Sequence, residues 1–220
     1  MRRIYPYLVV LAALALVVGV AACKKKAEAP ATAETASTAA VAPPPETPLA
    51  LSAEAQKLAK GTKVAAMEME KGGIVEIEML DKETPNTAAN FEKLIADKFY
   101  DGLPVHRVED FVVQAGDATL AGRVNPDIKL AVEKDKRKCV RGAVSMARGM
   151  APGSKEYGDT SPTQFFILKK DSNYLDPDFC VFGVVVSGMD VVDKIAPDDV
   201  IKRMRVLTVG EGAPTAAEKK

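Results

Sequence analysis

The side chains of this chain that could do chemistry gather in three segments, residues 105–117, 141–148 and 163–183. The first of these segments places Arg107 four positions before Phe111. Alone, an arginine on a strand is usually a solvated charge, and a phenylalanine is usually a core residue. Together, the three segments could supply a fixed cation, an apolar pocket and amide groups. This set suits binding and polarising a group rather than breaking a bond.

The composition argues against several other kinds of chemistry. The 220 residues include 30 basic and 30 acidic side chains, and no basic stripe interrupted by aromatics points to nucleic acid. The chain has a single histidine, His106, and three cysteines that lack zinc-ligand spacing. His106 adjoins Arg107, but neighbours on a strand face opposite ways, so we expect a structural role for it rather than a general base. We expect neither a metal nor a cofactor.

Alternating apolar residues predict the strands that would position these side chains. Residues 67–70 and 75–79 alternate on either side of a Gly-Gly turn, which predicts a β-hairpin. Thr84 and Pro85 predict the start of a helix. Further strands are predicted at residues 111–113, 142–146, 165–168, 181–186 and 200–209, a second helix at 187–196, and a loop over the site at 149–162. Many short strands with two helices indicate a mainly β fold, a closed barrel capped by helices.

Residues 1–22 have the features of a signal peptide. Two arginines near the start precede an apolar run, Leu8 to Val20, which is short for a transmembrane helix of roughly 20 residues. Cys23 follows Val-Ala-Ala, a stretch that resembles a bacterial lipobox. We expect Cys23 to be lipidated and to anchor the chain in the bacterial cell envelope. Lys24 follows the cysteine, and in similar lipoproteins a lysine there permits transfer to the outer membrane, so we expect the chain to face the periplasm from that membrane. An ordinary secretory signal and an uncleaved anchor remain alternatives.

The region between Cys23 and the globular part has a different composition. Residues 24–50 are rich in alanine and proline and predict a disordered tether. A short helix is expected at residues 51–60, with Ser52 as its cap. We place the globular domain at residues 64–210, and residues 211–220 are expected to form a flexible tail.

In their order and spacing, the three segments resemble the cyclophilin-type peptidyl-prolyl cis-trans isomerases. The resemblance rests on VHRVEDFVVQAGD at 105–117, RGAVSMAR at 141–148, TQFFI at 163–167, YLD at 174–176 and VFG at 181–183. TPNTAANF at residues 84–91 matches the first helix of the family. The resemblance covers residues 64–209 and implies a closed eight-stranded antiparallel β-barrel with a helix over each end. It also implies an enzyme that isomerises X-Pro bonds. The predicted signal peptide indicates exported polypeptides as substrates, and we expect a monomer.

The resemblance also assigns roles, position by position. Arg107 matches the catalytic arginine. Phe111, Met146, Phe166 and Leu175 match the walls of the proline pocket, and Val112, Tyr174 and Phe179 are further residues expected to contact the substrate. Gln114 and Gln164 match groups that bind the substrate backbone, and Ala147 and Arg148 match the stretch that holds the residue before proline.

Several positions depart from the pattern of the family. Val112 stands where methionine is common, and Phe179 stands where a histidine often lines the groove, which makes the groove more apolar. Tyr174 replaces the tryptophan associated with tight cyclosporin binding, so we expect cyclosporin to inhibit this chain only weakly. Residues 118–133 match the family pattern poorly. A non-catalytic proline-binding chaperone or scaffold remains the alternative function, and whether Cys139 and Cys180 pair stays open.

Overall fold

The computed structural model describes residues 48–134, 136–150 and 156–210. The predicted signal peptide, Cys23, most of the predicted tether and the tail from residue 211 lie outside these residues. Within them, no helix combines the length and the apolar character that crossing a membrane requires.

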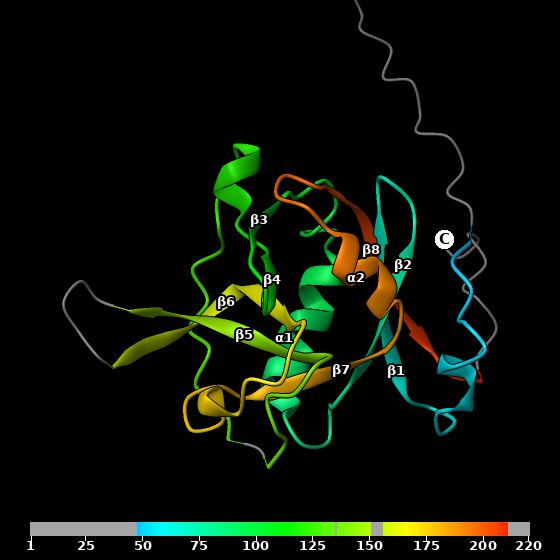
Figure 1. The fold of residues 1–220 in the computed structure, drawn as a ribbon, viewed down its shortest axis with the longest axis horizontal. Helices are drawn as coiled ribbons and strands as arrows, with labels where there is room; N and C mark the ends of the chain where they lie inside the picture. The colour runs from blue at the N-terminus through cyan, green and yellow to red at the C-terminus, as the bar shows by residue number, and fades with distance from the viewer. Residues whose placement is uncertain (1–47, 135, 151–155, 211–220) are drawn as a thin grey trace, which may run out of the picture. The chain divides into compact units, whose positions relative to one another are not determined.

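Eight strands and two α-helices make up the fold of the described residues (Figure 1). The strands are β1 (Lys63–Met69), β2 (Ile74–Met79), β3 (Val105–Val108), β4 (Val112–Ala115), β5 (Ala143–Met150), β6 (Tyr157–Leu168), β7 (Val181–Ser187) and β8 (Ile201–Thr208). The α-helices are α1 (Pro85–Ala96) and α2 (Met189–Lys194), and the 3-10 helices are η1 (Ala55–Lys57), η2 (Ala118–Ala121) and η3 (Asn173–Leu175). The predicted mainly β class with two helices is confirmed.

The predicted hairpin is formed by β1 and β2, with Met67 opposite Val75. Gly72 and Gly73 make the turn with φ values of 96° and 93°, a region that side chains disfavour. A Cβ on Gly73 would lie 2.7 Å from the Val191 side chain, so this glycine also lets α2 pack closely against the turn. The turn therefore requires glycine for both its backbone and its packing.

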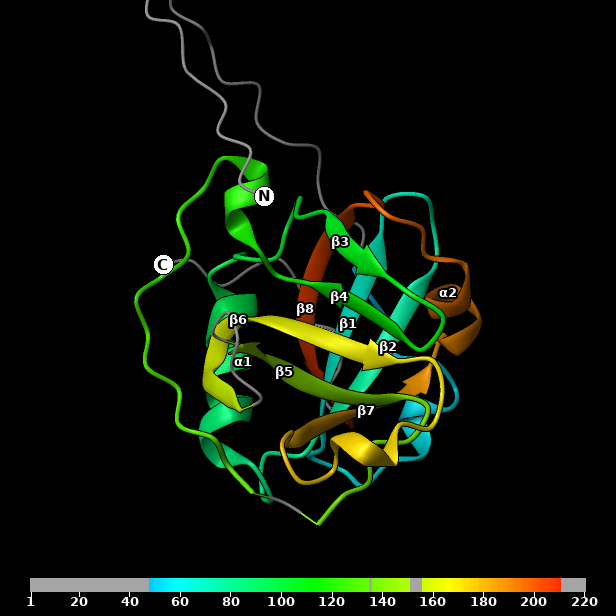
Figure 2. The same cartoon turned by 60° about the vertical axis from the view of Figure 1, so that its left-hand side comes forward.

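All strand pairs are antiparallel, and the sheet runs in the order β3-β4-β6-β5-β7-β2-β1-β8. The sheet is curled, and Figure 2 shows α1 on the left, beside one end of β5 and β6. The predicted closed barrel is wrong, because β3 and β8 remain the two edges of the sheet. The two edges are connected near the starts of β3 and β8. An isolated bridge joins Pro104 to Val200, and the Gly102 N–H donates to the Ile201 oxygen at 2.8 Å. Pro104 has no N–H to donate, so this contact stays an isolated bridge and does not add a ladder between β3 and β8.

The main core forms around Phe91 of α1. Its ring lies 5.1 Å from that of Tyr100, 5.2 Å from Phe165 of β6 and 4.8 Å from Phe182 of β7, measured between centroids. All four side chains are buried, and tilted or edge-on aromatic pairs of this kind stabilise beyond their apolar area. This core holds β6 and β7 in place from the inside, so their outer face can carry a site.

The hairpin of β5 and β6 is longer than the sequence predicts. Residues 149–162 were predicted as a loop, yet Gly149 and Met150 belong to β5, and β6 already begins at Tyr157. The two strands project from the body on the left of Figure 1. Their pairing is irregular, with register shifts on both sides of Arg148. Glycine and proline suggested a loop, but pairing with the neighbouring strand overrides local preference.

The segment before β1 packs on the sheet as a strap, which we define as residues 48–62. The expected ten-residue helix is reduced to the 3-10 helix η1, because so short an α-helix is marginal in water. Leu49 is buried against Ala66 and Leu207, so the packed region begins within the predicted tether. The Ser52 amide donates to the buried Glu76 carboxylate at 2.7 Å and joins the strap to β2.

Candidate active site

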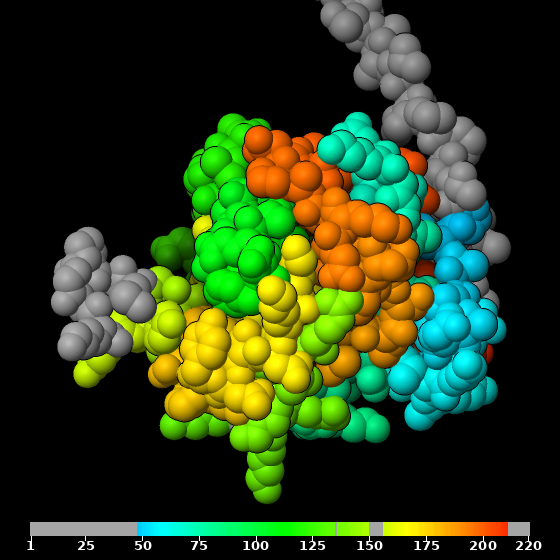
Figure 3. All heavy atoms as spheres, in the orientation of Figure 1, coloured from blue at the N-terminus to red at the C-terminus, as the bar shows by residue number. Residues whose placement is uncertain are grey.

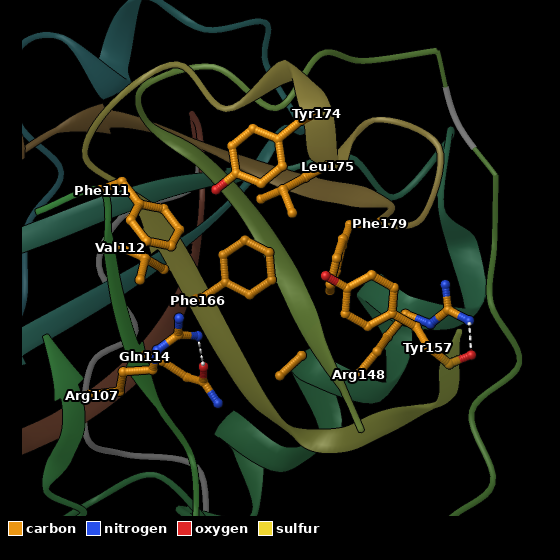
Figure 4. Close-up of a pocket in the computed structure, with 11 residues that line it drawn as sticks. Arg107, Phe111, Val112, Gln114, Arg148, Tyr157, Phe166, Tyr174, Leu175 and Phe179 are labelled. Carbon is orange, nitrogen blue, oxygen red and sulfur yellow. Dashed lines mark hydrogen bonds between the residues drawn. The ribbon is translucent and has the colours of Figure 1, made fainter. Parts of the chain in front are cut away.

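A pocket of about 370 Å³ opens on the outer face of the sheet between β4, β5, β6 and η3 (Figure 4). It lies on the side of the molecule that carries the green and yellow elements in Figure 3. Its lining residues are Arg107, Phe111, Val112, Gln114, Ala147, Arg148, Tyr157, Phe166, Tyr174, Leu175 and Phe179. Arg107 and nine of the eleven predicted substrate-binding residues thus lie around one cavity. Met146 and Gln164 are the two that do not line it.

Strand pairing sets the central row of the site. Arg107 of β3 lies opposite Gln114 of β4, and Gln114 lies opposite Phe166 of β6. Directly opposed residues project from the same face of a sheet, with Cβ atoms roughly 5 Å apart. The sequence motifs therefore become a cation, an amide and an aromatic ring side by side.

The floor of the pocket is apolar and well packed. Val112, Phe166 and Leu175 are buried in a second hydrophobic cluster that also contains Cys139. Phe111 is half-buried at the rim, and Tyr174 is 67 % exposed at the mouth. Such a floor suits a small apolar ring, and the exposed tyrosine leaves one side of the pocket open.

Arg107 is held at the polar edge of this floor. Its Nε donates to Glu109 at 2.7 Å, its Nη1 donates to Gln114 at 3.2 Å, and its guanidinium carbon lies 5.8 Å from the centre of the Phe111 ring. The hydrogen bond from Arg107 lowers the pKa of Glu109. These contacts orient the guanidinium while its side chain stays 44 % exposed.

A chain of amides continues from Arg107 along the sheet. Gln114 donates to Gln164 at 2.9 Å, and Gln164 donates to Asp117 at 3.4 Å. The pKa of Asp117 is lowered, chiefly by the Thr119 hydroxyl and despite burial, so the chain ends on a carboxylate. Gln164 does not line the pocket itself, and it is connected to the lining by its hydrogen bond with Gln114.

His106 takes no part in the pocket lining. Its Nδ1 is buried without a hydrogen-bond partner in the described residues, and burial lowers its pKa. The His106 imidazole therefore lies beside the site rather than in it.

Met146 is the predicted pocket residue that the structure places elsewhere. Its side chain is 3 % exposed and belongs to the main core, on the opposite side of β5 from Ala147. Alternation along a strand separates these two neighbours. The register shift after Met146 then lets Arg148 follow Ala147 to the pocket, as bulges do when they redirect a side chain.

Tyr157 is a lining residue that the sequence did not reveal. It lies at the start of β6, in the segment predicted as a loop, and its ring packs edge-on against Phe179 at 4.7 Å. An aromatic residue beside a Gly/Pro-rich stretch was the only available signal.

The described residues contain no cluster of three or more histidine, cysteine, aspartate or glutamate side chains that could hold a metal ion.

Solved structures with the same architecture identify the fold. A cyclophilin-type peptidyl-prolyl cis-trans isomerase of Cryptosporidium parvum, crystallised in the presence of the dipeptide Ala-Pro, aligns with a TM-score of 0.57 at 22 % identity, over 66 % of this chain and 99 % of that chain. A cyclophilin of Hirschia baltica aligns with a TM-score of 0.55 at 23 % identity, over 69 % of this chain and 75 % of that chain. The fold is that of the cyclophilins.

Sequence comparison identifies the family. Residues 64–210 match the family described as cyclophilin type peptidyl-prolyl cis-trans isomerase/CLD. Peptidyl-prolyl cis-trans isomerase B of Bacillus subtilis is 37 % identical over 141 residues, which cover 63 % of this chain and 94 % of the relative. A peptidyl-prolyl cis-trans isomerase of Helicobacter pylori is 36 % identical over 152 residues, 67 % of this chain and 88 % of the relative. The chain belongs to the cyclophilin-type peptidyl-prolyl cis-trans isomerase family, whose members are enzymes.

Proposed function

We propose that this chain isomerises X-Pro bonds of exported proteins and that the Arg107 guanidinium provides the catalysis, without a covalent intermediate or a metal. The observation that carries the proposal is the row Arg107, Gln114 and Phe166 across three paired strands. This row sets a hydrogen-bonded cation directly beside an apolar floor.

The reaction needs little more than such a row. Amide resonance sets a rotation barrier of about 18–20 kcal/mol, and uncatalysed X-Pro exchange takes tens to hundreds of seconds. Raising the rate to about 10³ per second requires roughly 7 kcal/mol of differential stabilisation. No bond is broken, so a nucleophile and a base are unnecessary.

Arg107 can stabilise the twisted bond through the proline nitrogen. As resonance is lost, this nitrogen becomes pyramidal and accepts a hydrogen bond, and an arginine stays charged and presents a rigid fork of five donors. Within the described residues, Glu109 and Gln114 engage two of these donors. The remaining donors of Arg107 can reach the nitrogen of a proline ring that lies on Phe166. The apolar surroundings there strengthen the hydrogen bond.

The substrates are proposed to be proline-containing polypeptides. The Cryptosporidium relative was crystallised in the presence of Ala-Pro, and the pocket described above has the apolar floor that a proline ring needs. Gln114 would hold the carbonyl next to proline, so that one end of the amide turns while the other stays fixed.

The test compares the full chain with Arg107→Ala and Arg107→Lys in an X-Pro exchange assay by NMR. We expect Arg107→Ala to lose at least about a hundredfold in rate, as removal of a preorganised donor does. Arg123→Ala is the matched control, because the Arg123 guanidinium also lies 5.8 Å from a phenylalanine ring, that of Phe99, but does not line the pocket. Equal exchange rates for wild type and Arg107→Ala would instead favour the non-catalytic proline-binding module.

We also propose that lipid on Cys23 anchors the chain in the bacterial envelope, facing the periplasm from the outer membrane. Lipidation of this type adds more than one acyl chain, and two are enough for stable anchoring. In cells supplied with labelled palmitate, the chain should incorporate label and fractionate with outer membranes. Cys23→Ser should lose both properties and Cys180→Ser should keep them, whereas label that persists in Cys23→Ser would exclude this anchor.

A further inference from the structure

The pocket extends beyond the proline floor along a line of aromatic rings. Phe166 packs edge-on against Phe179 with centroids 5.3 Å apart, and Phe179 packs edge-on against Tyr157 at 4.7 Å. All three side chains line the same cavity (Figure 4). Phe179 and Tyr157 lie on the opposite side of Phe166 from Arg107 in that view. The groove therefore has an aromatic end that a proline ring on Phe166 does not fill.

Arg148 holds this aromatic end together. Its Nε donates to the Gly158 oxygen at 3.0 Å, its Nη2 donates to the Tyr157 oxygen at 3.1 Å, and its Nη1 donates to the Asp178 oxygen. Its guanidinium carbon also lies 5.7 Å from the centre of the Tyr157 ring. One side chain thus ties the start of β6 to the residue preceding Phe179. Since its donors serve backbone carbonyls, Arg148 is suited to positioning the wall rather than to binding the substrate.

We propose that Tyr157 determines specificity by accepting a large apolar or aromatic side chain next to proline, and that Arg148 is the positioning residue that holds Tyr157 against Phe179. This inference rests on the proposed function and adds the preferred class of flanking residue. A flat aromatic surface at the end of an apolar groove binds apolar side chains through area and ring geometry. Ala147, which precedes Arg148 and also lines the pocket, contributes only a methyl group to the wall.

The Arg148 cation raises a competing possibility, an acidic flanking residue. A guanidinium that already donates to three carbonyl oxygens has fewer donors for a carboxylate than Arg107 has. The geometry therefore favours the apolar class, and the experiment includes acidic peptides as an outcome that would overturn it.

The experiment measures kcat/KM of the full chain on two peptide series with one proline each. Alanine, leucine, phenylalanine and glutamate are placed directly before proline in the first series and directly after it in the second. We expect phenylalanine and leucine to exceed alanine by about three- to tenfold at one of the two positions, the gain of an added aromatic contact. Glutamate should not exceed alanine at either position.

Three variants connect this preference to the wall. Tyr157→Phe should keep the phenylalanine-to-alanine ratio, and Tyr157→Ala should bring it close to one, mainly through KM. Arg148→Lys keeps the charge but cannot reproduce the three-way contact, so it should also lower the ratio. Arg141→Lys is the matched control, because Arg141 binds Asp193 through two donors and lies outside the pocket lining.

The outcomes separate the inference from the proposed function. If wild type fails to accelerate exchange even in the alanine peptides, the proposed function fails. If wild type is active but shows no apolar preference in either series, prefers glutamate, or keeps its preference in Tyr157→Ala, the inference fails while the enzyme assignment stands.

Discussion

The backbone amide of Thr87 donates a hydrogen bond to the carboxylate of Glu133 at 2.7 Å. The amide of Asn86 donates to the same carboxylate at 3.0 Å, so both contacts lie in the first turn of α1. Thr84, which the sequence predicts as the cap, occupies the N-cap position but donates its hydroxyl to the Leu80 oxygen instead. Glu133 therefore caps the helix from a segment 46 residues away in the chain.

Glu133→Ala should destabilise the fold. Loss of a helix cap costs about 0.5–2 kcal/mol, and the partly buried position of Glu133 favours the upper half of that range. Urea unfolding of the full chain gives the free energy of unfolding. Glu54→Ala is the control, since Glu54 occupies the N-cap position of η1 without a side-chain cap. Equal losses in the two variants would contradict the capping role.

The stabilisation by Glu133 should depend on pH. Burial raises its pKa, but hydrogen bonds from Thr87 and Asn86 outweigh burial and lower the pKa below its ordinary value of 4.5. A lowered folded-state pKa stabilises above the unfolded pKa and stops doing so as pH falls through the folded pKa. The difference in unfolding free energy between wild type and Glu133→Ala should be constant near about pH 7 and shrink below about pH 4. A difference that grows on acidification would contradict this sign.

Gln114 and Gln164 should act on Arg107 as one unit. Gln114→Ala removes a direct partner of the guanidinium and should lower kcat/KM by about tenfold, the value of a charge-assisted hydrogen bond. Gln164→Ala should lower it less, because Gln164 reaches Arg107 only through Gln114.

A double-mutant cycle measures this coupling. The double variant should lose little more than Gln114→Ala alone, whereas independent roles would make the two losses multiply. Gln56→Ala is the control, an exposed glutamine of the strap that donates to the Leu51 oxygen.

The strap should contribute to the stability of the fold. Leu49→Ala removes a side chain that is 8 % exposed and packed on Ala66 and Leu207, at an expected cost of about 2–3 kcal/mol. Leu120→Ala, at a leucine that is 54 % exposed, should change the unfolding free energy by less than about 0.5 kcal/mol. Similar unfolding free energies for the two variants would mean that the strap does not stabilise the sheet. Fragments for assay should accordingly begin before Leu49.

The resemblance of the sequence motifs to the family was sufficient to predict which residues lie together around most of the pocket. Arg107, Phe111 and Gln114 stand in one segment, and their spacing along two antiparallel strands joined by a short turn determines which residues oppose one another. The hairpin at residues 67–79 and the start of α1 at Pro85 follow from alternation and proline, signals that act over a few residues.

Register irregularities decided what the motifs could not. Alternation along β5 places Met146 and Ala147 on opposite faces, but it cannot tell that Arg148 joins Ala147 at the pocket, because the shift after Met146 depends on pairing with β6. The same pairing draws Tyr157 out of a predicted loop and into the wall of the pocket. Local composition carries no information about a partner strand.

By itself, the sequence predicted the family, the order of most strands and of both α-helices along the chain, and a cation, an amide and several aromatic residues that lie around one pocket. Only the tertiary structure decided that the sheet stays open between β3 and β8, that Glu133 caps α1, and that Arg148 binds three carbonyl oxygens beside Tyr157. Each of these features joins groups that are remote in the chain or depends on how two strands come into register. Local propensity and spacing do not specify such contacts, because the energy of the packed chain as a whole selects them.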